Sequence, residues 1–166
     1  MNRDGEKWKI YWNDFMTDAY VYGNEVSFKP GNEVEIKNNL IPAGTVLKTW
    51  YSKTNYQMQK IEPSLPIIDG EGEYLLYLNA DTDVEDGVLL KLIFYDRYDI
   101  QIGQMIIRDK ETVFRCPLAT YSYCMQFVLA GARHVVFRNV AIQELENEPA
   151  DDFKQSESNI EKGQKL

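Results

Sequence analysis

Histidine and cysteine are scarce in this chain of 166 residues, which contains one His and two Cys. Cys116 and Cys124 occur without a secretory signal, so we predict two buried or half-buried free thiols and no structural disulfide. His134 has no carboxylate in an obvious orienting position, which disfavours a Cys–His nucleophilic pair. The chain also lacks a Gly-x-Gly-x-x-Gly motif, a Walker loop and a Gly-x-Ser-x-Gly elbow. These absences predict a protein that is not an enzyme and needs no cofactor.

Basic residues are outnumbered by acidic ones, 18 to 26, and the formal net charge is −8. Affinity for nucleic acid depends on Lys and Arg that neutralise phosphates, so nucleic acid is not an expected partner. The N-terminal residues are polar and lack the apolar region of a signal peptide, and no apolar run approaches the length of about 18 residues that spans a bilayer. We therefore expect a cytoplasmic protein with no integral membrane segment.

Helical periodicity is missing as well, and alternation of polar and apolar residues takes its place. The strictly alternating run 33–37 follows the turn-forming residues 29–32, which predicts a hairpin with the run 20–28. The same reasoning predicts a second hairpin between the runs 74–80 and 88–94. Residues 121–129 alternate over a longer stretch, which predicts a half-buried strand with its polar positions on the opposite face.

The last strand candidate, residues 135–142, changes parity, since Val135 and Phe137 fall on one face but Val140 and Ile142 on the other. A β-bulge near Arg138 would reconcile them. With about nine or ten strand candidates separated by turn residues, the chain is predicted to be all-β, a two-sheet antiparallel β-sandwich of the jelly-roll type. We expect an N-terminal extension (1–8), the sandwich domain (9–146) and a disordered acidic tail (147–166).

An acidic turn lies between the strands of the second predicted hairpin. It contains Asp81, Asp83, Glu85 and Asp86, followed by Gly87. Such a segment could bind calcium, which prefers carboxylate and carbonyl oxygens, although the ligand spacing of an EF-hand is absent. A solvated turn explains the same residues, and we favour it.

The segment from Trp50 to Gln59 concentrates aromatic rings and side-chain amides. If residues 54–59 form a strand, Asn55, Gln57 and Gln59 form a row of amides on one face, while Tyr56 lies on the other. The row predicts a contact surface. Trp50 could stack on a ligand or anchor the core, because large apolar rings are more often buried.

A second aromatic position, Tyr95, has the parity of Lys91 and is expected to point away from the core. An outward ring beside charged side chains could form a ligand platform, although an exposed turn in which Asp96 pairs with Arg97 is the simpler explanation. The predicted ligand-binding residues are Trp50, Asn55, Gln57, Gln59, Tyr95 and Arg97.

Several segments, taken in order, resemble a known family over residues 8–145. They are Lys9-Ile10-Tyr11-Trp12 with Asp14, Tyr20-Val21-Tyr22-Gly23, Trp50 and Ser52 with Thr54-Asn55-Tyr56-Gln57 and Leu65-Pro66, Phe94-Tyr95-Asp96-Arg97, and Tyr121-Ser122-Tyr123 with Ala130-Gly131. Together they are similar to the third of the Asp proteins of the bacterial accessory Sec system.

This resemblance implies a β-sandwich similar to carbohydrate-binding modules, with no established catalytic role. It implies two sister Asp proteins as partners, one glycosyltransferase-like and one acyltransferase-like, together with the accessory SecA motor and a glycosylated serine-rich repeat adhesin. Two functions follow as hypotheses. The chain could be an adaptor for export of the adhesin, or a module that binds N-acetylglucosamine-type modifications on it.

Overall fold

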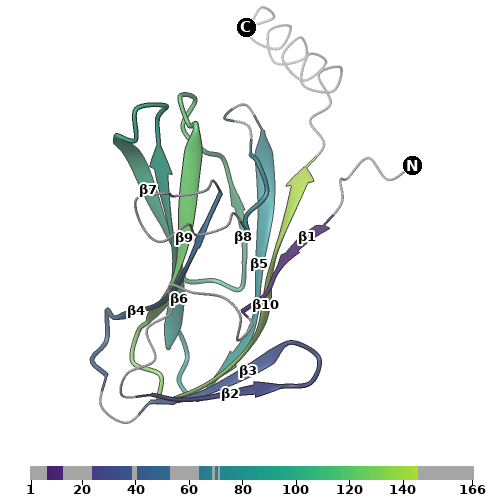
Figure 1. Ribbon diagram of the computed structural model, residues 1–166, viewed down its shortest axis with the longest axis vertical. Helices are drawn as coiled ribbons and strands as arrows, with labels where there is room; N and C mark the ends of the chain where they lie inside the picture. The colour runs from purple at the N-terminus through teal and green to yellow at the C-terminus, as the bar shows by residue number, and fades with distance from the viewer. Residues whose placement is uncertain are drawn as a thin grey trace, which may run out of the picture.

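Two antiparallel β-sheets packed face to face form the fold, as the ribbon of the computed structural model shows (Figure 1). The structure describes residues 7–12, 24–38, 41–52, 64–68, 70 and 72–145. Within these ranges the chain forms ten strands and no helix, and hence no helix long and apolar enough to cross a membrane. The predicted all-β sandwich is confirmed.

Sheet A has six strands and sheet B has four. In sheet A the order is β2 (Asn24–Lys29), β3 (Glu33–Asn38), β10 (His134–Leu145), β5 (Glu73–Thr82) and β8 (Glu111–Phe114), and β1 (Lys7–Ile10) also pairs with β10. In sheet B the order is β4 (Val46–Tyr51), β9 (Ser122–Leu129), β6 (Val88–Tyr95) and β7 (Gln101–Ile107).

The first predicted hairpin is confirmed by the pairing of β2 with β3. Gly31 and Asn32 between the strands have φ angles of 80° and 64°. Glycine and asparagine tolerate this left-handed region better than other residues, so the turn is encoded locally.

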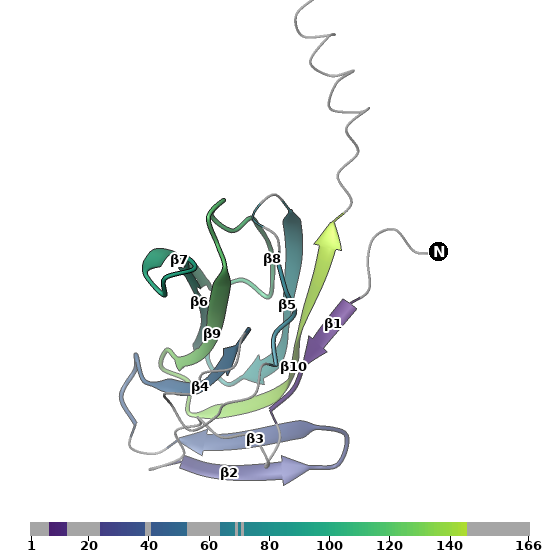
Figure 2. The same ribbon diagram turned by 45° about the horizontal axis from the view of Figure 1, so that its top comes forward.

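The predicted bulge in the last strand is confirmed as well, because the pairing of β10 with β5 shifts register between Phe137 and Asn139. The shift brings the buried residues on both sides of it onto the core face of sheet A. It also divides β10 between two neighbours, since residues 134–137 pair with β3 and residues 140–143 with β1. Figure 2 shows β10 bending where it passes from one neighbour to the other.

The second predicted hairpin is wrong. β5 pairs with β10 and β8 in sheet A, whereas β6 lies between β9 and β7 in sheet B, so residues 83–87 form a corner between the sheets. Asp83 Oδ1 accepts hydrogen bonds from the backbone N–H groups of Arg133 and His134, and the Gly87 carbonyl accepts two more from residues 130 and 132. Alternation identifies the core face of each strand but not its neighbour, and a tight hairpin and a crossover use similar turn residues.

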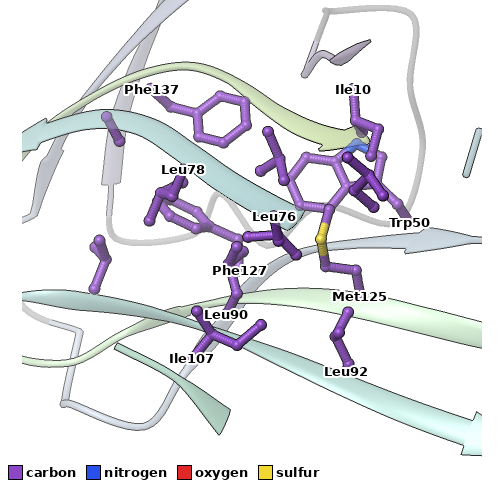
Figure 3. Close-up of a cluster of buried hydrophobic side chains, with 14 of the residues drawn as sticks. Ile10, Trp50, Leu76, Leu78, Leu90, Leu92, Ile107, Met125, Phe127 and Phe137 are labelled. Atoms are coloured by element: carbon purple, nitrogen blue, oxygen red, sulfur yellow. The ribbon is translucent and has the colours of Figure 1, made fainter. Parts of the chain in front are cut away.

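The core lies between the sheets, where side chains from both point toward one another (Figure 3). Phe137 of β10 packs against three other rings, those of Trp12, Trp50 and Phe127, with centroids 6.3, 5.6 and 5.1 Å away. This cluster joins both sheets to the segment that follows β1.

The long strand predicted from residues 121–129 is β9 (Ser122–Leu129), and Tyr123, Met125, Phe127 and Leu129 face the core as expected. The prediction is wrong for Tyr121, which precedes the strand and is 64% exposed. Two polar positions of β9, Ser122 and Cys124, are nevertheless buried on the outer face. β9 is flanked by β4 and β6, whose side chains cover short outward-facing groups. Both cysteines are buried thiols, as predicted.

Candidate functional site

Trp50 lies in the core, which decides between the two roles that the sequence left open. Its side chain is 1% exposed, its ring stacks on Phe137, and its Nε1 donates a hydrogen bond to the Tyr11 carbonyl oxygen at 3.0 Å. The ring therefore offers no face to a ligand. Asn55, Gln57, Gln59 and the remainder of the predicted strand 54–59 lie outside the described residues.

Tyr95 ends β6 on the outer face of sheet B and is half-buried, while Arg97 is exposed in the following turn. The Tyr95 hydroxyl is 3.9 Å from Cys124 Sγ. Burial, with the nearby thiol second, raises the pKa of Tyr95 to about 12. The hydroxyl is thus protonated at neutral pH. A ligand role for Tyr95 and Arg97 stays a prediction.

A hollow of about 280 Å³ lies on the outer face of sheet A, where β1, β10, β5 and β8 are neighbours. Leu75 and Ala141 contribute apolar surface, and Tyr77, which is 41% exposed, contributes a ring. Lys7, Glu111 and Gln143 add an ammonium, a carboxylate and an amide to its lining. One exposed ring with several polar groups can hold a small polar ligand that has one apolar face.

Ion pairs cross the same outer face beside the hollow. Arg138 Nη2 is 2.8 Å from Asp81 Oδ2, and its Nε is 3.2 Å from Glu33 Oε2. His134 Nε2 is 2.6 Å from Glu35 Oε2, so the sequence-based view that no carboxylate orients this histidine is wrong. The partners are 99 residues apart and meet because β3 pairs with β10.

Hydrogen bonds lower the pKa of three carboxyl groups on this side of sheet A, those of Asp81, Asp83 and Glu35. The hydrogen bond from Arg138 is the main cause for Asp81, and the hydrogen bond from His134 is the main cause for Glu35. The backbone N–H of His134 is the main cause for Asp83. Two acidic residues of the possible calcium loop are thus engaged by protein groups, and no cluster of three or more metal-binding side chains occurs in the described ranges.

Replacing Arg138 with Met is expected to raise the pKa of Asp81 toward its usual value and to lower stability at neutral pH. Stability from a lowered carboxyl pKa is present above the unfolded pKa and is lost as the pH falls through the folded pKa. The difference between wild type and R138M should therefore be largest at neutral pH and shrink as the pH falls below about 5, as measured by urea unfolding. A difference that stayed constant with pH would contradict the assigned ion pair.

The most exposed large apolar side chains among the described residues gather at one end of the sandwich, which we name the loop end. They are Ile67, Tyr98, Ile100, Leu118 and Tyr121. Figure 1 shows at this end the turn between β6 and β7, the connection between β8 and β9, and the segment that enters β5.

Hydrogen bonds hold these three segments together. Tyr121 N–H donates to the Tyr95 carbonyl at 2.8 Å, and the Tyr123 hydroxyl donates to the Pro66 carbonyl at 2.6 Å. A Cβ on Gly70 would lie only 2.7 Å from the Leu118 carbonyl oxygen, so the chain passes closely there. The three segments that carry the exposed apolar side chains of the loop end therefore lie against one another.

The family model for the accessory Sec secretory system ASP3 proteins matches residues 19–144. The chain belongs to this family. Its likeness to known members covers most of the sequence, in agreement with the resemblance identified from the motifs. The accessory Sec system protein ASP3 of Streptococcus gordonii is 30% identical over 146 residues, which cover 82% of this chain and 92% of that protein.

Two solved complexes contain chains whose structures are similar to this family member. The crystal structure of accessory secretory proteins 1, 2 and 3 from Streptococcus pneumoniae contains a chain with a TM-score of 0.77 and 33% identity, covering 88% of this chain and 99% of that one. The glycosylation-associated Gap123 complex of Streptococcus agalactiae has a chain with a TM-score of 0.77 and 32% identity, covering 86% of this family member but 46% of that chain.

Sequence reasoning missed both the hollow and the loop end in this family member. The hollow collects side chains from four strands, and no local motif joins Lys7, Tyr77, Glu111 and Gln143. For the loop end a signal was present, since Tyr98, Ile100, Leu118 and Tyr121 are apolar residues in turn-rich segments. Such residues are less common in turns than Gly, Pro, Asn or Asp, and they could have been singled out.

Proposed function

We propose that this chain is a non-enzymatic adaptor subunit of the bacterial accessory Sec system. It binds the two sister Asp proteins and, through them, assists the accessory SecA motor in the export of glycosylated serine-rich repeat adhesins. The observation that carries the proposal is the likeness to chains solved within complexes, at a TM-score of 0.77 and 32 to 33% identity.

The loop end supports the docking part of this proposal. Leu118 is 77% exposed and Ile67 is 93% exposed, in a chain whose net charge favours solubility. Protein interfaces place such apolar and aromatic anchors at their centre, where a few of them account for most of the binding energy. We expect the sister proteins to cover this end.

Co-expression of the chain with its two sister proteins tests the proposal. We expect a stable complex on size exclusion, and we expect the double substitution Tyr98→Lys with Leu118→Lys to weaken it by about tenfold or more. Val84→Lys is the matched control, because Val84 is an exposed apolar residue in the corner between β5 and β6.

The outcomes distinguish the adaptor function from the position of its docking surface. If the wild-type chain emerges only as free protein, the adaptor function is rejected. If the complex forms and tolerates the double substitution as well as it tolerates V84K, the adaptor stands and the loop end is not its docking surface.

A second function, the binding of N-acetylglucosamine-type modifications on the adhesin, is favoured by the hollow on sheet A. Exposed rings stack on the apolar face of a sugar, and carboxylate, amide and ammonium groups bond to hydroxyls. Tyr77, Glu111, Gln143 and Lys7 supply these groups.

Calorimetric titration with a glycosylated serine-rich peptide tests this function. Binding that Tyr77→Ala abolishes and Tyr95→Ala leaves intact would assign it to the hollow, and the reverse would assign it to the Tyr95 side. Absence of binding at millimolar peptide would reject the glycan function.

A further inference from the structure

Strand β7 is an edge strand without a charged residue. It ends the order β4-β9-β6-β7 of sheet B, and in the described part of the chain it pairs with β6 alone. Its sequence is Gln-Ile-Gly-Gln-Met-Ile-Ile. An edge strand exposes unpaired N–H and C=O groups, and proteins usually protect it with charges, prolines, bulges or a covering segment.

The other edge strands that the structure describes follow this rule. β1 carries Lys7 and Lys9, β2 carries Glu25 and Lys29, β4 carries Lys48, and β8 carries Glu111. The chain has a net charge of −8, yet β7 is the one described edge strand without a charged side chain. This difference suits an edge that pairs with another uncharged strand.

The geometry of β7 leaves five residues fit for regular pairing. The pairing with β6 shifts register where Phe94 faces Gly103 and Tyr95 faces Gln101, so Ile102 is the extra residue. From Gly103 to Ile107 each residue faces one residue of β6 without interruption. On the outward face of this stretch Gln104 is exposed and Ile106 is 48% exposed.

We propose that β7 pairs antiparallel with β7 of a second copy of this chain, about a two-fold axis at Met105. The pairing joins the two four-stranded sheets B edge to edge into one continuous sheet. In this register Gln104 faces Ile106 of the second copy on the outward side, so the exposed isoleucine lies along an amide side chain. Backbone hydrogen bonds then satisfy the free edge on both copies.

The charges of the two turns that flank β7 fit this occupant. In the turn before it, Asp96 and Asp99 outnumber Arg97, and in the turn after it, Arg108 and Lys110 outnumber Asp109. An antiparallel arrangement brings the acidic turn of each copy beside the basic turn of the other. The same sequence therefore supplies a neutral centre and two complementary ends, which favours a second copy over an unrelated strand.

The proposal does not depend on the adaptor function, and the purified full chain tests it. Met105→Cys places two thiols opposite each other across the axis, where paired Cα atoms are about 4.5 to 5.5 Å apart, within the range of a disulfide. Mild oxidation should link most of the chains into a dimer on a non-reducing gel. Val113→Cys, an exposed position on the charged edge strand β8, should not cross-link, and wild type should not either because Cys116 and Cys124 are buried.

Sedimentation equilibrium gives a second measurement that needs no new thiol. Wild type should be dimeric at about 100 μM. Ile106→Lys, which adds an outward charge to the edge, should weaken the dimer at least tenfold while the circular dichroism spectrum of the fold is retained.

Two results would overturn the proposal. One is a wild-type chain that is monomeric at that concentration, including the case in which β7 amides become protected from hydrogen exchange only when a sister protein is added. The other is a dimer that forms without cross-linking M105C and without responding to I106K.

Discussion

Replacing Phe137 with Ala is expected to lower the free energy of unfolding by about 3 to 5 kcal/mol, the largest effect that we predict. The ring, on β10 of sheet A, is fully buried and contacts Trp50 and Phe127 of sheet B and Trp12 of the segment after β1. Its removal deletes apolar contact and leaves a cavity that three large rings cannot close without leaving their own positions. Urea unfolding followed by tryptophan fluorescence measures the loss.

Phe28→Ala is the matched control for this prediction. Phe28 is a strand residue of the same type, but it is 43% exposed and lies on β2 at the edge of sheet A. Its truncation should cost about 1 kcal/mol or less, because nearly half of its surface already contacts water and it lies outside the aromatic cluster. Equal losses in the two variants would mean that the aromatic cluster is not the centre of the core.

Replacing Asn38 with Leu is expected to lower the free energy of unfolding by about 2 to 4 kcal/mol, because it removes three side-chain hydrogen bonds to buried and part-buried backbone groups. Asn38 is buried at the end of β3. Its Oδ1 accepts the backbone N–H of Ile41 at 2.8 Å, and its Nδ2 donates to the carbonyl of Ile41 at 3.1 Å and to that of Ala132 at 3.5 Å. A leucine fills similar space and can replace none of these contacts.

Asn38→Asp separates hydrogen bonding from volume. A protonated Asp can donate and accept as Asn does, whereas a buried carboxylate cannot donate and is poorly solvated. The stability difference between N38D and wild type should therefore shrink on acidification, while the difference for N38L should not change. If N38L were as stable as wild type at pH 7, the structural role of this amide would be refuted.

Local signals of the sequence were sufficient for the first hairpin and for the bulge in the last strand. Gly31 and Asn32 predict the first hairpin because few other residues accept their backbone angles. The parity change after Phe137 predicts the bulge, because the only way to bury residues on both sides of it is to insert one residue.

Local sequence signals could not predict which strands pair with one another in the sheets. The corner at residues 83–87 satisfies its polar groups through residues 130–134, which are distant in sequence. The role of Trp50 could not be predicted for the same reason. An aromatic residue on a strand can face the core or the solvent, and the choice depends on which strands lie beside it. The predicted roles of Asn55, Gln57 and Gln59 remain predictions, because they fall outside the described residues.

The position of β10 in sheet A has a consequence for biosynthesis. β10 is the last strand along the chain, yet it lies in the middle of the sheet, between β3 and β5 and beside β1 (Figure 1). Until residues 134–145 have left the ribosome, the strands on either side of this position have no common neighbour, and their edges stay open. Sheet A can therefore close only after synthesis of the domain is nearly complete, and the growing chain carries unpaired strand edges until that moment.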